Sequence, residues 1–224
     1  MSVPFYVPPE QLIREKANFA RNGISRGRSV VALTYADGLL FVADNPSATL
    51  YKLSEIYDRI AFAAAGRYSE YEQLRVGGIR NAEVKGYQYA REDVNARSLA
   101  NAYSNALAAA FTESPKPFEV ELLIAEVTAA DVELYHILFD GSITDEQGHV
   151  AIGGNAEAVN ARLTDSFRQN LALADAFTVA RAALLDSDQQ AEVHRLEVAG
   201  LDRTRGRRKF FRLEERRVAE LIGG

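Results

Sequence analysis

Side chains that could carry out chemistry are few in this sequence, and they do not form a recognisable catalytic or metal-binding motif. The three histidines, His136, His149 and His194, are far apart and lack the spacing of metal ligands, so the sequence predicts no metal site. Glu119 and Glu121 alternate on one face of a predicted strand, a pattern more typical of a wet sheet face or a subunit contact than of acid–base catalysis. The chain contains no cysteine, which excludes thiolate chemistry and disulfides.

Two glycine pairs are candidates for a phosphate-binding loop. Gly77-Gly78 and Gly153-Gly154 both lack the surrounding glycines and the lysine that such a loop requires. Both pairs are therefore predicted to lie in turns. No motif in the sequence calls for a cofactor.

Basic residues are concentrated in the segment 201–209. They are Arg203, Arg205, Arg207, Arg208 and Lys209. Two interpretations are open, a nucleic-acid-binding patch and a solvated loop, and the loop is favoured because no aromatic residue interleaves with the arginines to stack on bases. The whole chain, with a net charge of -5 and a pI near 5.4, has no general attraction to nucleic acid or anionic lipid.

Size and composition indicate one globular domain. The 224 residues are 47% hydrophobic and 25% charged, an ordinary balance that argues against extended disorder. Residues 1–9 contain prolines and lack a basic region followed by a long apolar run, so no secretory signal is predicted. No run of about 18 or more apolar residues predicts a membrane span. We expect a cytoplasmic protein.

The first predicted element is a helix that begins after Pro8-Pro9 and ends before Gly23. Residues at helical spacing give it an apolar face, made of Leu12, Ile13, Ala17 and Ala20. This face suits either a core helix or a helix that docks on a neighbouring subunit.

The remaining elements come in groups. Asp37-Gly38 separates two apolar runs and predicts a hairpin. Strands are expected over 29–35, 39–43, 50–56 and 59–65, helices over 69–79 and 98–111, strands over 118–127 and 132–139, helices over 156–169 and 174–185, and extended segments over 192–201 and 210–213. Grouped runs favour antiparallel sheets with helices stacked outside. The expected fold class is α+β, a four-layer αββα sandwich.

A series of motifs spans nearly the whole chain. In order they are Gly27-Arg28-Ser29-Val30-Val31-Ala32-Leu33, Ala36-Asp37-Gly38, Phe41-Val42-Ala43-Asp44-Asn45, Tyr51-Lys52-Leu53, Ala63-Ala64-Ala65-Gly66, Ser98-Leu99-Ala100-Asn101-Ala102-Tyr103, Pro115-Lys116-Pro117-Phe118-Glu119-Val120 and Ala151-Ile152-Gly153-Gly154. Together they resemble the proteasome α subunit family, and specifically its actinobacterial type. The fold of that family, an αββα sandwich of the N-terminal nucleophile type, agrees with the predicted order of elements.

The resemblance places Arg28 where catalytic β subunits carry their threonine nucleophile. That threonine must become the first residue of its chain, because its free α-amine serves as the base. A guanidinium stays protonated and cannot attack a peptide, although Asp44 and Lys52 match the supporting residues of the β subunits. The resemblance therefore implies a non-catalytic subunit of a threonine-type endopeptidase complex. The alternative is a self-processing peptidase that is cleaved before Ser29 and loses its N-terminal helix.

The resemblance also implies a binding site for an activator. Family members offer the lysine at position 52, in a pocket between neighbouring subunits, to the C-terminal carboxylate of a ring-shaped ATPase. Gly27, Gly66 and Arg67 match positions near the same pocket, where glycine lets a tail approach the backbone. Arg67 replaces an apolar residue of some α subunits. The alternative role for Lys52 is a strand lysine bonded to Asp44 or to solvent.

The start of the chain resembles the gate of the family, in which N-terminal segments close the axial pore of the ring. The gate residues are Met1, Ser2, Val3, Pro4, Phe5, Tyr6, Val7 and Pro8. We therefore divide the chain into a gate segment over residues 1–9 and a proteasome α-type domain over residues 10–224. A disordered terminus is the alternative.

The function that the resemblance implies is scaffolding and gating. Seven copies form each outer ring of the proteasome core particle, template rings of proteolytic β subunits and dock the ATPase. The implied partners are β subunits, neighbouring α subunits, the ATPase tails and protein substrates tagged with a ubiquitin-like modifier, with neither nucleic acid nor a membrane among them.

Overall fold

Two antiparallel five-stranded sheets form the centre of the computed structural model, which describes residues 8–185 and 195–223. The first sheet has the order β10-β9-β2-β1-β8 and the second the order β3-β4-β5-β6-β7. The strands are β1 (Val30–Tyr35), β2 (Gly38–Asp44), β3 (Leu53–Tyr57), β4 (Ile60–Gly66), β5 (Val120–Val127), β6 (Val132–Ile137), β7 (Ile143–Asp145), β8 (His149–Ile152), β9 (Leu196–Asp202) and β10 (Phe210–Arg212). The gate residues 1–7 lie outside the described ranges.

The predicted hairpin at Asp37-Gly38 is confirmed, since β1 pairs with β2 in a register that sets Tyr35 opposite Gly38. Both strands are almost completely buried because one face packs on the second sheet and the other on helices. This double burial explains their continuous apolar runs. Between the sheets, Phe41, Leu53 and Leu123 are fully buried, and each side chain of this kind contributes about 1.5–3 kcal/mol.

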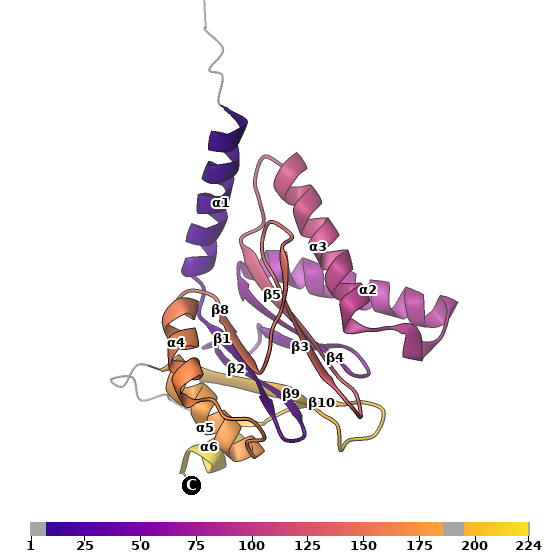
Figure 1. Ribbon diagram of the computed structural model, residues 1–224, viewed down its shortest axis with the longest axis vertical. Helices are drawn as coiled ribbons and strands as arrows, with labels where there is room; N and C mark the ends of the chain where they lie inside the picture. Colours follow the sequence, from indigo (N-terminus) through magenta and orange to yellow (C-terminus); the bar gives the residue numbers. More distant parts are fainter. Residues whose placement is uncertain (1–7, 186–194, 224) are drawn as a thin grey trace, which may run out of the picture.

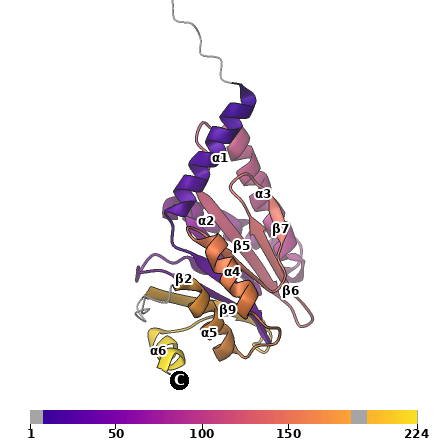
Figure 2. The same cartoon turned by 60° about the vertical axis from the view of Figure 1, so that its left-hand side comes forward.

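Helices cover both outer faces and complete four layers (Figures 1 and 2). On the second sheet lie α2 (Tyr68–Gln88) and α3 (Ala96–Glu113), joined through the short η1 (Arg91–Asp93). On the first sheet lie α4 (Ala156–Ser166), α5 (Leu173–Leu184) and α6 (Glu215–Gly223). The predicted αββα sandwich is therefore confirmed. Within the described ranges, no helix is both long and apolar enough to cross a membrane.

Helix α1 (Pro9–Ser25) extends away from the sandwich (Figure 1). Only its last turns are buried, at Ala20 and Ile24, whereas Ile13 is 56% and Phe19 48% exposed. Lys16 anchors the helix, because its ammonium donates to the carbonyl oxygens at the end of α3, including those of Phe111 at 2.9 Å and Ser114 at 2.8 Å. Part of the predicted apolar face is therefore core, and the outer part is free for another chain.

Two glycine predictions were wrong. The first helix does not end before Gly23 but continues to Ser25. A Cβ at Gly23 would lie 2.0 Å from Oε2 of Glu119, whose side chain occupies that space. Gly77-Gly78 is not a turn but lies inside α2, where the hydroxyl of Tyr103 would lie 1.7 Å from a Cβ at Gly78. Close packing on the helix, and not a chain reversal, requires glycine at 23 and 78.

Of the two interpretations for Glu119 and Glu121, the wet sheet face was wrong, whereas a subunit contact stays a prediction. Glu119 is 6% exposed, and the Glu121 carboxylate accepts the backbone N–H of Gly153 at 2.9 Å. Burial raises the pKa of Glu121 above its usual range. Both carboxylates therefore belong to the interior of the chain, at the end of the sandwich near α1.

Several boundaries also differ. The strand expected over 50–56 begins only at Leu53, and α2 runs to Gln88 instead of ending at Ile79. The short strands β7 and β8 and the terminal helix α6 were not predicted. Strands of three or four residues carry too little periodicity to be found in a sequence.

Candidate functional site

The structure brings Gly27 and Gly66 into contact at the base of α1. Gly27 lies in the connection from α1 to β1, and Gly66 ends β4. A Cβ at Gly27 would lie 3.0 Å from the backbone nitrogen of Gly66, so neither position leaves room for a side chain. Gly66 has a φ of 109°, and a Cβ there would lie 2.0 Å from the carbonyl oxygen of Glu119. Two glycines that were predicted near one pocket thus form one bare backbone surface.

Lys52 lies beside this surface, just before β3. Its ammonium donates to the carbonyl oxygen of Arg28 at 2.5 Å, and the residue is 9% exposed. Burial lowers the pKa of Lys52 to about 8, although the carboxylates of Asp44 and Glu197 oppose this shift. The alternative in which Lys52 bonds directly to Asp44 is not what the structure shows, since Asp44 acts on the ammonium only through its charge.

Asp44 holds the side chain of Arg28. The Arg28 Nη1 lies 2.7 Å from Asp44 Oδ2, and Arg195 Nη2 lies 3.0 Å from the same oxygen. Ser29 is 8% exposed, and its hydroxyl oxygen accepts the N–H of Asn155 at 3.2 Å. The serine hydroxyl thus helps to fix the loop before α4.

Arg67 lies next to Gly66 in a network of four charged side chains. Its guanidinium is 3.0 Å from Glu119 Oε1 and 3.7 Å from Glu70 Oε1, and its side chain is 54% exposed. Lys116 also pairs with Glu70 and lies 2.9 Å from Glu119 Oε1. This network was not predicted, and its two local signals are the spacings of three between Arg67 and Glu70 and between Lys116 and Glu119.

Glu197 is a second residue that sequence reasoning missed. Its buried carboxylate accepts the backbone N–H groups of Lys52 at 2.9 Å and Leu53 at 3.1 Å, the side-chain amide of Asn45 at 2.7 Å and the guanidinium of Arg212 at 2.5 Å. It therefore fixes the backbone that carries Lys52. A single glutamate inside the apolar run of β9 is the only signal that could have found it.

The basic segment 201–209 is tied to neighbouring turns. Arg207 lies 3.2 Å from Asp58, Arg208 lies 2.6 Å from Glu55, and Lys209 donates to the carbonyl oxygens of Arg203 and Arg205. Arg205 also stacks over the ring of Phe211. These pairs connect the β9–β10 turn to the β3–β4 turn, which favours the interpretation as a loop.

The histidines do not form a site in the described part of the chain. His136 is surrounded by protein, and burial lowers its pKa to about 4. His149 packs on Phe167 with a ring separation of 4.9 Å, and His194 lies outside the described residues. Within the described ranges, no group of three histidine, aspartate or glutamate side chains could hold a metal ion.

Comparison with known proteins identifies the family of the chain. The model of the family described as "Proteasome subunit" matches residues 24–199. The chain is 55% identical to the proteasome subunit alpha of Streptosporangium roseum, over 99% of this chain and 87% of that protein. It is 52% identical to the subunit alpha of Thermomonospora curvata and 53% identical to that of Frankia alni, with 97–98% of these proteins covered. The chain therefore belongs to the proteasome subunit family, as an α subunit of the actinobacterial type.

Proposed function

We propose that this chain is a non-catalytic α subunit of the proteasome core particle, a threonine-type endopeptidase complex. Membership of the family implies association with other proteasome subunits in rings. In our proposal seven copies form each outer ring, template the rings of β subunits, gate substrate entry and dock a ring-shaped ATPase. The observation that carries the proposal is the ion pair between Arg28 and Asp44, at the position where the resemblance places the nucleophile of β subunits.

The absence of catalysis follows from the chemistry of that position. A nucleophile needs a lone pair that a base can free, whereas the guanidinium of Arg28 keeps its proton at any working pH. Lys52 and Asp44 remain where they support a threonine in the catalytic relatives, but here they hold the carbonyl oxygen and the side chain of Arg28. Supporting residues without a nucleophile cannot cut a peptide.

Docking of the ATPase is proposed at Lys52, Gly27, Gly66 and Arg67. An ammonium that binds a carboxylate contributes on the order of 1.5–3 kcal/mol, which is too little for firm docking by one tail. The contact of Gly27 with Gly66 supports close approach of a tail backbone at the same place. Repeated pockets around a ring raise the effective concentration of linked tails, so several weak contacts act together.

Replacing Lys52 with alanine is expected to weaken stimulation by the cognate ATPase. Binding of a fluorescent peptide of the last eight ATPase residues to the assembled particle should fall at least about tenfold, because the ammonium that pairs with the carboxylate is gone. Arg216→Gln is the matched control, since this side chain is 91% exposed on α6. Undiminished stimulation in Lys52→Ala particles of normal size would disprove docking at this residue.

The gate is proposed for residues 1–9, which precede the proteasome α-type domain of residues 10–224. Pro8, the last of the named gate residues, immediately precedes α1, and Pro9, the last residue of the segment, begins this helix, whose first turn projects beyond the sandwich (Figure 2). This position supports a segment that leaves the body of the subunit. The proposed segment is rich in proline and apolar side chains, which suits reversible packing of copies near an axis.

Deletion of Ser2 to Pro8 is expected to speed peptide hydrolysis by the reconstituted particle, because a pore without its gate admits short peptides freely. The isolated deletion variant should cleave nothing, which controls for activity created in the α subunit itself. Turnover of a fluorogenic peptide by particles of equal concentration gives the measurement. An unchanged rate in the deletion particle argues against a gate at these residues.

The proposed substrate route and location rest on the resemblance alone. In the actinobacterial lineage, the family serves proteins that are tagged with a small ubiquitin-like modifier and delivered by the ATPase. We extend this route to the present chain and place it in the cytoplasm. Intact tagged protein incubated with particle and ATPase, followed by gel analysis of its loss, tests the route.

A further inference from the structure

Cations outnumber carboxylates around Asp44. The Asp44 carboxylate pairs with both Arg28 and Arg195, and the Lys52 ammonium lies close enough to feel its charge. Three cationic side chains thus share one carboxylate. Like charges at such short range repel one another, so this excess makes the local potential positive.

The neighbouring Glu197 does not cancel the excess. Its carboxylate is already paired with Arg212 at 2.5 Å. In the part of the chain that the structure describes, the Lys52 cluster therefore contains four cations and two carboxylates. An excess of positive charge at one end of a sheet is favourable only when an anion joins it.

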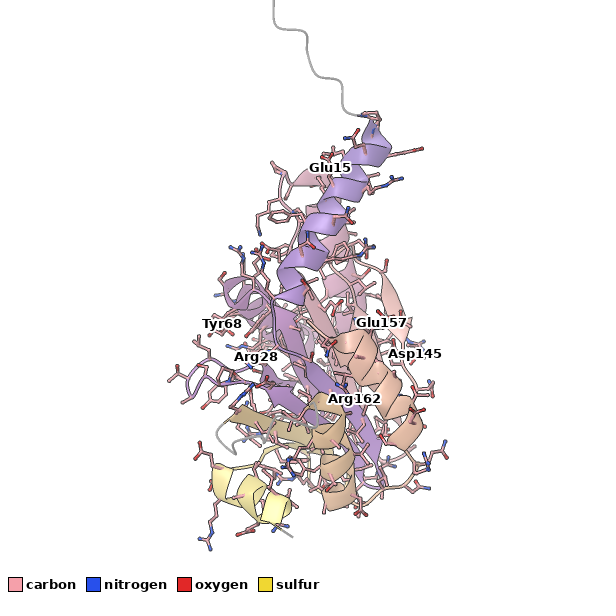
Figure 3. All side chains as sticks on the ribbon, turned by 90° about the vertical axis from the view of Figure 1, so that its left-hand side faces the viewer. Glu15, Arg28, Tyr68, Asp145, Glu157 and Arg162 are labelled. Carbon is pink, nitrogen blue, oxygen red and sulfur yellow. The ribbon has the colours of Figure 1, made fainter. Side chains whose placement is uncertain are left out.

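Arg28 has the most exposed side chain of the cluster, ahead of Arg195 at 29% and Arg212 at 31%. Its side chain is 47% exposed, whereas Lys52 is 9% exposed. Figure 3 shows Arg28 below the lower end of α1. Gly27, which directly precedes Arg28, contacts Gly66, so an anion that approaches the glycine surface comes close to the exposed side chain of Arg28. A guanidinium has five N–H donors and can bind a carboxylate in addition to Asp44.

We infer that Arg28 is a second binding residue for the carboxylate of the activator tail, and that Asp44 positions its guanidinium beside Lys52. The inference rests on the proposed docking function. In this arrangement the carbonyl oxygen of Arg28 holds the ammonium of Lys52 and its side chain supplies the outer donor. One residue thereby serves the site with both its backbone and its side chain.

The test compares tail peptides on the assembled particle. The probe is a fluorescent peptide of the last eight residues of the cognate ATPase, made with a free carboxylate and, as its control, with a C-terminal amide. Arg28→Gln should weaken binding of the free acid by about tenfold and leave the amide unchanged, while Arg28→Lys should restore part of the affinity. Arg216→Gln serves as the matched surface control, and particle size verifies assembly.

The outcomes separate this inference from the docking function on which it rests. If Lys52→Ala weakens binding and Arg28→Gln does not, docking stands and Arg28 is not a binding residue. An equal loss for acid and amide peptides would assign Arg28 a structural role and overturn the inference. If neither variant matters, the docking function itself is wrong.

A second readout requires no peptide. Acetic anhydride acetylates only the neutral amine, so mass spectrometry across a pH series reports the titration of Lys52. In the parent particle the midpoint should lie near pH 8. Because Arg28 repels the ammonium and Asp44 and Glu197 attract it, Arg28→Gln should move the midpoint upward. An unmoved midpoint would place the guanidinium too far from Lys52 to share a ligand with it.

Discussion

Replacing Glu197 with alanine is expected to lower the free energy of unfolding by about 3–5 kcal/mol, the cost of removing one partner from a buried ion pair. The variant leaves the N–H groups of Lys52 and Leu53, the amide of Asn45 and part of the Arg212 guanidinium without their acceptor. A buried donor without a partner costs about 1–3 kcal/mol, so the backbone donors alone account for much of the loss. Urea unfolding of the purified chain measures it.

Two further variants bracket this result. Glu197→Gln keeps one carbonyl oxygen and should lose less stability than alanine, but it cannot pair with the charge of Arg212. Glu220→Ala removes a carboxylate that pairs with Arg217 at 2.8 Å while 48% exposed, and should change stability by less than about 1 kcal/mol. If Glu197→Ala lowered the free energy of unfolding by as little as this, the carboxylate would not contribute to holding the two sheets together.

Replacing Gly66 with alanine is expected to destabilise the chain by about 3 kcal/mol or more. A φ of 109° is strained for any residue with a side chain, and the new Cβ would lie 2.0 Å from the backbone oxygen of Glu119. Relief of this overlap requires the end of β4 to move away from β5 and breaks the bond from Arg67 N–H to Glu119, now 2.9 Å long. The midpoint of urea unfolding should fall accordingly.

Gly77→Ala is the matched control for a glycine substitution. Gly77 lies in α2 and a Cβ there meets no atom within 4 Å, so alanine should stabilise the helix by about 1 kcal/mol. If Gly66→Ala and Gly77→Ala both stabilised the chain, the backbone of Gly66 would not be as constrained as the structure indicates.

The long apolar elements could be predicted from the sequence, because burial on two faces leaves a continuous signal in strands such as β1 and β2. The order of these strands and helices, in groups along the chain, was enough to predict the four layers of the sandwich. Contacts between distant residues could not be predicted. Gly23 and Gly78 look like chain breaks in a sequence, and only the positions of Glu119 and Tyr103 explain why a helix carries glycine at each place.

In the candidate site, too, some residues could be predicted from the sequence and others could not. Arg28, Asp44 and Lys52 were identified through resemblance, and the structure brings them together within one cluster. Glu197 was not identified, because it lies 145 residues from the backbone group of Lys52 that it binds. The contact between β9 and the segment before β3 joins the two sheets, and no local pattern in the sequence encodes it.

Helix α1 has a consequence for the free polypeptide. A lone helix of 17 residues is marginal in water, and the packing that the sandwich supplies is concentrated at its last turns and at Lys16. Leu12 and Ile13 would gain burial only from a neighbour. Burial of this apolar surface by a neighbouring subunit is expected to add stability to the outer turns of α1.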